Sequence, residues 1–488
     1  MDDLFLLKKK EIVNYFLKKD IIINVETLEK LDNSEKLNLL YDSVIKNTDD
    51  VLFLSSKENS SDILIKPKKE RSPVKILFNY RELVKKREIK DFVSYFNNRY
   101  KALRSILQQR QELQSVVSVN RIIGKKEREQ VAFIGMVLEK QITKNGNYIL
   151  IVEDITGSIK VLISKNKPDL IAEVKDIVED EVIGIVGASG EGIVFAQAII
   201  HPDVPLNKEF KKSPIESYAI FTSDLHFGAK MFLKENWDKF MKWLNGEIGS
   251  EEQKKIVEKI DYVFFIGDLI EGVGIYPDQE KDLAIPDVFD QYKAFALEAQ
   301  KIPKHMNIII CPGNHDAMRI AEPQPMLYKE YAQCVYDIEN AIIVTNPSLV
   351  NIGAGKGFPG FDVLLYHGFS IPFLSEAVES IRQQGGQKRT DLIMKFMLQR
   401  RHLAPPHTST QYIPDPDFDP LVIEKVPDLF VTGHVHRATA ATYRNVTMLN
   451  CSTWISETDY QRKVGLTPEP ARVHLVNLQT REVKIMKF

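Results

Sequence analysis

The chain has 488 residues, of which 44% are hydrophobic and 27% charged, and its net charge is −2. These values are typical of globular proteins, and the length predicts about two or three domains. No apolar run approaches the roughly 18 residues that span a bilayer, so we expect no membrane partner and no signal peptide. The three cysteines (Cys311, Cys334 and Cys451) form no CxxC pair, which favours a reducing, cytoplasmic location over a disulfide framework.

Two segments precede the first β-rich region. Residues 1–50 carry apolar side chains at helical spacing, such as Leu4, Ile12 and Phe16, which predicts a small helical N-terminal unit. Residues 51–114 are expected to form a basic linker that contains a helix over 91–104. Aromatic residues alternate with basic ones in that helix, and such a stripe is more often core than a ligand-stacking surface.

Residues 66–128 are rich in positive charge, with 18 Lys and Arg residues and only 6 Asp and Glu residues. A basic segment of this kind often contacts phosphate backbones or an acidic partner. A solvated helix face next to a linker explains the same composition equally well.

Residues 115–205 change to short β-rich runs with Asn145-Gly146 and Thr156-Gly157 at the turns. Three strands, a helix and two strands follow one another, which is the order of an OB-fold β-barrel. Many OB-folds bind single strands and many are only spacers, so the pattern leaves contact with DNA open.

Residues 216–488 alternate apolar runs with helical stretches, the pattern of a layered α/β domain. Five polar motifs occur in this part, each directly after a strand-like run or one residue beyond it. Because open α/β sheets place their sites at the carboxyl ends of strands, we expect these motifs to converge. They are Asp224-Leu225-His226, Gly267-Asp268, Gly313-Asn314-His315-Asp316, His367-Gly368 and Gly433-His434-Val435-His436.

These residue types are metal ligands. Imidazole, carboxylate and amide donors without thiolate suit Mn²⁺, Fe²⁺ or Zn²⁺, with Mg²⁺ as a further candidate. One carboxylate can bridge two such ions about 3.5–4 Å apart, the arrangement used in phosphoryl chemistry. A chance match to Gly-Asn-His-Asp alone is expected in well under about 1% of chains this long. The other histidines lack such a context and are assigned no metal: His201, His305, His402, His407 and His474.

The motif set resembles the calcineurin-like metallophosphoesterases, which include the Mre11 nucleases, over about residues 216–488. The resemblance implies a four-layer domain (αββα) with helices outside two β-sheets and a site for two divalent ions. It implies a first ion held by Asp224, His226, Asp268 and His436, and a second held by Asp268, Asn314, His367 and His434. It also implies that His315 acts beside the scissile phosphate as general acid or transition-state stabiliser, with Asp316 as the partner that orients it.

An OB-fold ahead of such a domain, with every ligand kept, resembles the small subunits of archaeal family-D DNA polymerases. Residues 91–100, 400–405 and 450–454, with Gln461 beyond, strengthen this resemblance, whereas Pro406-His407 departs from it. It implies a Mn²⁺-stimulated 3′-to-5′ proofreading exonuclease that hydrolyses DNA at a 3′ end. It also implies a large catalytic subunit as partner and contact with the sliding clamp through the complex.

Two other functions stay open. The first is a non-catalytic scaffold with a vestigial site, against which the intact ligand set argues. The second is a stand-alone repair nuclease or another phosphodiesterase, against which the OB-fold and the helical N-terminal unit argue weakly.

Overall fold

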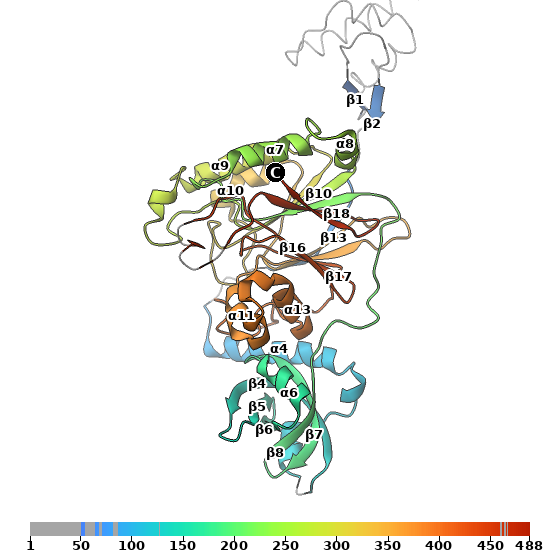
Figure 1. Ribbon diagram of the computed structural model, residues 1–488, viewed down its shortest axis with the longest axis vertical. Coiled ribbons are helices and arrows are strands. Elements are labelled where there is room, and N and C mark those ends of the chain that lie inside the picture. Colours follow the sequence, from blue (N-terminus) through green and yellow to red (C-terminus); the bar gives the residue numbers. More distant parts are fainter. Residues whose placement is uncertain are drawn as a thin grey trace, which may run out of the picture. The chain divides into compact units, whose positions relative to one another are not determined.

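A computed structural model describes residues 50–53, 64–67, 71–81, 86–125, 127–458, 461–462, 465 and 467–488 (Figure 1). The chain divides into two compact units, Met1–Arg71 and Ser72–Phe488. In the first unit, β1 (Asp50–Phe53) pairs with β2 (Leu64–Pro67) in antiparallel register. The helical unit expected over 1–50 falls, up to residue 49, outside the described residues and stays a prediction.

In the second unit, five strands close into a barrel in the order β4-β5-β6-β8-β7. Successive side chains of a strand point to opposite faces, so alternate residues such as Phe133, Leu150 and Val161 fill the barrel. The predicted order of three strands, a helix and two strands is present, and assigning the barrel to the OB-fold stays our interpretation. The elements are α5 (Val119–Ile123), β4 (Gln130–Ile142), β5 (Tyr148–Asp154), β6 (Gly157–Ile163), α6 (Pro168–Lys175), β7 (Val182–Gly190) and β8 (Ile193–Ile200).

The predicted aromatic helix is α4 (Ile89–Leu107), which begins with a capping box formed by Glu88 and Asp91. Its buried Tyr100 and Leu103 pack on Ile134 of the barrel. These contacts confirm that the aromatic stripe is mostly core. In Figure 1, α4 runs between the barrel and the helices α11 and α13.

The rest of the second unit is a sandwich of two six-stranded sheets with helices on both outer faces. The first sheet has the order β12-β11-β10-β9-β18-β19, and α7, α9 and α10 cover its outer face (Figure 1). Its elements are β9 (Tyr218–Thr222), α7 (Lys234–Leu244), α8 (Glu251–Val257), β10 (Ile260–Ile266), α9 (Val288–Ala299), β11 (Asn307–Cys311), α10 (Lys329–Tyr336), β12 (Ala341–Ile343), β18 (Arg472–Asn477) and β19 (Val483–Lys487).

The second sheet has the order β16-β17-β15-β14-β13-β3, and α11 and α13 pack on its outer face. Between the sheets lies a core to which Phe221 and Phe264 contribute from one side and Val363 and Val431 from the other. The four layers implied by the resemblance are therefore present. The elements are β13 (Ser348–Ile352), β14 (Phe361–Leu365), α11 (Ile371–Ala377), α12 (Glu379–Gln383), α13 (Thr390–Arg400), β15 (Leu429–Thr432), β16 (Thr439–Tyr443) and β17 (Val446–Asn450).

One strand of this sheet comes from the segment predicted to be a linker. β3 (Val74–Asn79) pairs antiparallel with β13, so the linker interpretation over 51–114 is wrong for these six residues. The run is short and has a lysine within it, and its strand conformation comes from pairing with residues more than 260 positions later. Among the described helices, none is both long and apolar enough to cross a membrane.

Candidate metal centre

All five motifs lie just past the carboxyl ends of strands, as the sequence predicts. Asp224, Asp268 and Asn314 follow β9, β10 and β11 of the first sheet, and His367 and His434 follow β14 and β15 of the second. Parallel pairing aligns these strand ends within each sheet. Because the two sheets are stacked, their ends meet at one edge of the sandwich, where side chains from both sheets converge.

The backbone at this edge turns sharply. Left-handed conformations are unfavourable for residues that carry a Cβ atom, and they gather at functional sites where the surrounding structure enforces them. Five of the seven predicted ligands have φ angles between 51° and 72°: Asp224, His226, Asp268, His434 and His436.

Two motif glycines make room for the ligands. A Cβ atom on Gly267, whose φ is +81°, would stand 2.4 Å from Nδ1 of His367, and one on Gly313 would stand 2.3 Å from Oδ1 of Asp268. Both distances are far below van der Waals contact. These positions therefore require glycine because the ligands pack directly against the main chain.

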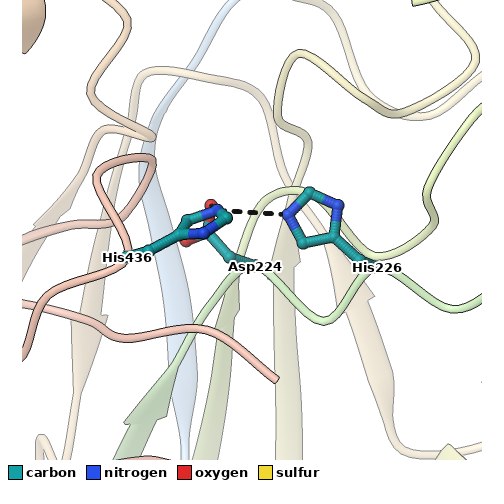
Figure 2. A group of neighbouring side chains, drawn as sticks. All are labelled: Asp224, His226 and His436. Carbon is teal, nitrogen blue, oxygen red and sulfur yellow. Dashed lines mark hydrogen bonds and ion pairs between the residues drawn. The ribbon is translucent and has the colours of Figure 1, made fainter. Parts of the chain in front are cut away.

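The first ligand cluster contains Asp224, His226 and His436 (Figure 2). The Nε2 atoms of the two histidines face each other at 3.2 Å, and Nε2 of His436 lies 3.3 Å from Oδ1 of Asp224. The other carboxylate oxygen, Oδ2, accepts hydrogen bonds from the His434 main chain (3.0 Å) and from Ser223. One oxygen of Asp224 is thus held in place while the other is turned towards the histidines.

The second cluster contains Asp268, His367 and His434, with Asn314 among them. Oδ1 of Asn314 lies 3.0 Å from Nε2 of His367 and 2.9 Å from Nδ1 of His434. The main-chain N–H of His315 donates to Oδ1 of Asp268 at 2.8 Å.

Asp268 faces both clusters. Its Oδ2 lies 3.3 Å from Nε2 of His367 in the second cluster and 4.0 Å from Nε2 of His226 in the first. All seven predicted ligands therefore converge at this edge, in two clusters that Asp268 faces; that they hold two ions stays a prediction.

These residues fit divalent cations. Within the described part of the chain, the buried Oδ1 of Asp224 accepts no hydrogen bond, although Nε2 of His436 lies 3.3 Å away. Burial opposes charge on His226, yet the Glu271 and Asp268 carboxylates outweigh it and raise the pKa of His226 to about 9. The carboxylates beside His226 thus favour positive charge at this side of the centre. An unsatisfied carboxylate oxygen opposite imidazole nitrogens is the donor set expected for Mn²⁺, Fe²⁺ or Zn²⁺.

His315 lies at the side of the first cluster. Its ring meets the ring of His226 edge to face, with centroids 4.6 Å apart. The Nδ1–H of His315 donates to the main-chain carbonyl of Glu271 at 2.8 Å, which leaves Nε2 as the nitrogen able to exchange a proton.

Asp316 points elsewhere than the resemblance implies. It is buried, and its carboxylate accepts hydrogen bonds from the Gly313 main chain (2.8 Å) and the Tyr292 hydroxyl (3.3 Å). Asp316 therefore shapes the loop that presents Asn314, whereas the contact that orients the His315 ring comes from the Glu271 carbonyl. The hydrogen bonds to Gly313 and Tyr292 turn the Asp316 carboxylate away from the role that the resemblance implies.

Two further residues support the ligands and were given no role from sequence. Oε2 of Glu271 lies 2.8 Å from Nδ1 of His226, and Nε2 of Gln461 lies 2.7 Å from Nδ1 of His436. Burial opposes charge on Glu271, but its bond to His226 outweighs this and lowers the pKa of Glu271 to about 2. The position of Glu271, three residues after Asp268 on the same loop, was the signal that could have identified it.

The five histidines outside the motifs stay outside the centre. Among the described residues, no candidate metal group includes any of them. His402, for example, is buried and pairs with Asp419, with 2.9 Å between Nε2 and Oδ2.

Comparison with known proteins agrees with this geometry. A family model described as calcineurin-like phosphoesterase matches residues 219–438. A Pyrococcus furiosus protein named DNA polymerase II small subunit is 39% identical over 405 residues, which are 82% of this chain and 64% of the relative. This chain thus spans less than two thirds of that relative's length.

Other relatives with the same name match over more of their length. The one from Methanothermobacter thermautotrophicus is 37% identical, over 82% of this chain and 80% of the relative. The one from Thermoplasma acidophilum is 30% identical, over 99% of this chain and 93% of the relative.

Proposed function

Because the chain belongs to the family of DNA polymerase II small subunits, we propose that it is the 3′-to-5′ proofreading exonuclease of a replicative DNA polymerase. The observation that carries this proposal is that all seven predicted ligands converge in two clusters, both of which Asp268 faces. A scaffold without catalytic activity has no use for five left-handed ligand residues, whose strain destabilises the fold.

The reaction is hydrolysis of the phosphodiester bond next to a DNA 3′ end. When bound, two divalent ions, which we expect to be Mn²⁺, supply Lewis acidity and lower the pKa of a water so that hydroxide is available near neutral pH. Asp268 stands between both ligand groups, and Asn314 contributes a neutral oxygen to the second. Attack at phosphorus breaks the bond to the 3′ oxygen of the preceding nucleotide, which needs a proton.

His315 supplies that proton in our proposal. Its Nδ1–H is committed to the Glu271 carbonyl, so the proton that moves is the one on Nε2. Burial lowers the pKa of His315, and a substrate oxygen that accepts a hydrogen bond from its Nε2–H favours the protonated ring. His315 therefore becomes a stronger candidate for general acid once DNA is bound.

The same proposal includes the partners. The name of the relatives implies a large catalytic subunit that polymerises DNA. We propose that the chain works beside such a subunit in the cytoplasm, and that the sliding clamp contacts it through the complex. The barrel and the basic residues between 66 and 128 are candidates for contact with DNA or with that subunit.

The test measures shortening of 5′-labelled DNA with Mn²⁺, on single strands and on primer–templates with matched or mismatched 3′ ends. Wild type, Asp268→Asn, His315→Gln and the exposed control His407→Gln are compared, alone and with a large subunit. We expect wild type and His407→Gln to shorten the DNA, His315→Gln to be slower by about 10²- to 10⁴-fold, and Asp268→Asn to be inactive.

Inertness of the wild type in every condition would contradict the exonuclease proposal and favour the scaffold. Hydrolysis of bis(p-nitrophenyl) phosphate without cleavage of DNA would favour a phosphodiesterase of another substrate class. Elemental analysis is expected to find two divalent ions per chain after Mn²⁺ loading.

A further inference from the structure

Phe369 is a partly exposed aromatic residue at the metal centre. It follows His367 and Gly368 directly, and its ring stacks on the ring of His434 with centroids 5.5 Å apart and an interplanar angle of 28°. The apolar core of this region includes the neighbouring Phe373 but, among the described residues, it does not include Phe369. The position of the Phe369 ring is therefore set by its contact with His434 and not by packing in the apolar core.

The main chain fixes this position. Gly368 has a φ of +117°, and a Cβ atom there would stand 2.8 Å from Cδ1 of Ile371 and 3.4 Å from Cβ of His434. The N–H of Ile371, the first residue of α11, donates to the Gly368 carbonyl at 2.9 Å. Phe369 thus sits on a short, hydrogen-bonded turn between a strand and a helix, so little ordering is needed before it can bind a flat ligand.

Phe369 and His315 flank different ligand groups. His315 packs against His226 of the first cluster, whereas Phe369 packs against His434 of the second. In a 3′-to-5′ exonuclease, the 3′ oxygen that leaves belongs to the penultimate nucleotide. That nucleotide lies on the side of the proton donor, and the terminal nucleotide lies on the opposite side.

We infer that Phe369 is a stacking platform for the base of the 3′-terminal nucleotide, an inference that rests on the proposed exonuclease function. Stacking of a base on an aromatic ring does not depend on which base is present. A proofreading site must accept any terminal base, and the Phe369 ring offers such a surface. Phe369 is on this view a positioning residue, because it touches the substrate base and not the reacting atoms.

The experiment combines enzyme variants with abasic substrates. Single-stranded DNA with a normal 3′ nucleotide is compared with DNA whose terminal or penultimate residue is a tetrahydrofuran lacking the base. Wild type, Phe369→Ala, Phe369→Leu and Phe369→Trp are tested with Mn²⁺, with the large subunit if the activity requires it. Phe289→Ala is the matched control, since Phe289 is 42% exposed and lies on α9.

We expect removal of the terminal base to lower kcat/KM of the wild type by about 5- to 100-fold. On normal DNA, Phe369→Ala and Phe369→Leu should have a kcat/KM lower than that of the wild type by a similar factor. On DNA with an abasic terminus, their kcat/KM should be lower than that of the wild type by less than about twofold. Phe369→Trp and Phe289→Ala should act like the wild type. The bound Mn²⁺ per chain should be unchanged in every variant.

Three results would overturn the inference. They are an equal loss on normal and abasic DNA, a coupling found only at the penultimate base, and a loss of Mn²⁺ that accounts for the slower reaction. A different result would contradict the proposed exonuclease function, namely a wild type that does not shorten DNA at all.

Discussion

At the scale of single residues, hydrogen bonds decide which atoms face the metal site. Main-chain N–H groups hold one oxygen of Asp224 and one of Asp268, and the other oxygen of each is turned towards histidine nitrogens. The carbonyl of Ile266 accepts from Nδ1 of His367 at 2.8 Å, which leaves Nε2 for a metal. The ligands are therefore oriented by their neighbours before any ion binds.

Glu271→Gln should weaken Mn²⁺ binding by roughly 10- to 100-fold, because the carboxylate beside Nδ1 of His226 strengthens that ligand. Isothermal titration of the metal-free protein measures this change. Glu280→Gln, an exposed residue of the same loop, is the control and should bind Mn²⁺ as the wild type does. Equal affinity of Glu271→Gln and wild type would show that the carboxylate does not support the site.

The burial of His402 predicts that the protein loses stability on acidification. Its Nδ1 accepts from the Ala404 N–H at 3.0 Å and its Nε2–H donates to Asp419, so the neutral ring is satisfied. Burial lowers the pKa of His402 from 6.5 to about 4. Between these two pH values the unfolded chain takes up a proton that the folded chain refuses, so folding weakens as the pH falls.

This difference in protonation changes the free energy of unfolding by roughly 3 kcal/mol in total. Urea unfolding of wild type and His402→Gln at several pH values between 7 and 4 measures it. The variant should show a shallower decline in its unfolding midpoint than the wild type. Parallel curves for His402→Gln and wild type would exclude His402 as the source.

At the scale of elements, the turns that follow the strands position the predicted ligands. β9, β10, β11 and β15 each stop within one residue of a motif. Gly313 shows this most directly, because its missing side chain is what lets β11 approach Asp268.

Gly313→Ala should displace the Asp268 carboxylate and lower the proposed nuclease activity by about 100-fold or more, since small misplacements of catalytic groups have effects of this size. The metal content, measured by elemental analysis, should fall with it. Gly355→Ala is the matched control, because a Cβ atom there meets nothing within 4 Å. Retained metal and activity in Gly313→Ala would contradict the crowding argument.

At the scale of the whole molecule, polar pairs tie the barrel to the sandwich. Arg400 of α13 and Glu181 before β7 form a buried ion pair with 3.0 Å between Nε and Oε2. Lys175 of α6 and Glu379 of α12 form a second pair at 2.9 Å that is largely exposed. The two pairs join the same parts of the chain but differ in burial.

Arg400→Met should destabilise the protein by about 3–5 kcal/mol, because it leaves the Glu181 carboxylate buried without its partner. Lys175→Met should destabilise the protein much less than Arg400→Met, since solvent screens the exposed pair. Urea unfolding gives the loss of stability, and limited proteolysis between barrel and sandwich reports loosening of the junction. Equal effects of both substitutions would show that burial of the pair does not matter.

The sequence alone predicted which side chains gather at this edge of the sandwich, because each motif is a local pattern; that they hold two ions stays a prediction. Each motif was predicted to follow a strand-like run, and β9, β11 and β15 each end with at most one residue between the strand and its motif. The order of strands and helix in the barrel was also predictable from local periodicity.

Only the tertiary structure decided the features that depend on residues far apart in the chain. β3 is a strand because it pairs with β13, and Glu271, not Asp316, orients the His315 ring because of how one loop folds. The contact of Phe369 with His434 is likewise visible only in the tertiary structure. Motifs record which ligands exist, whereas packing between distant segments determines which atoms face each other.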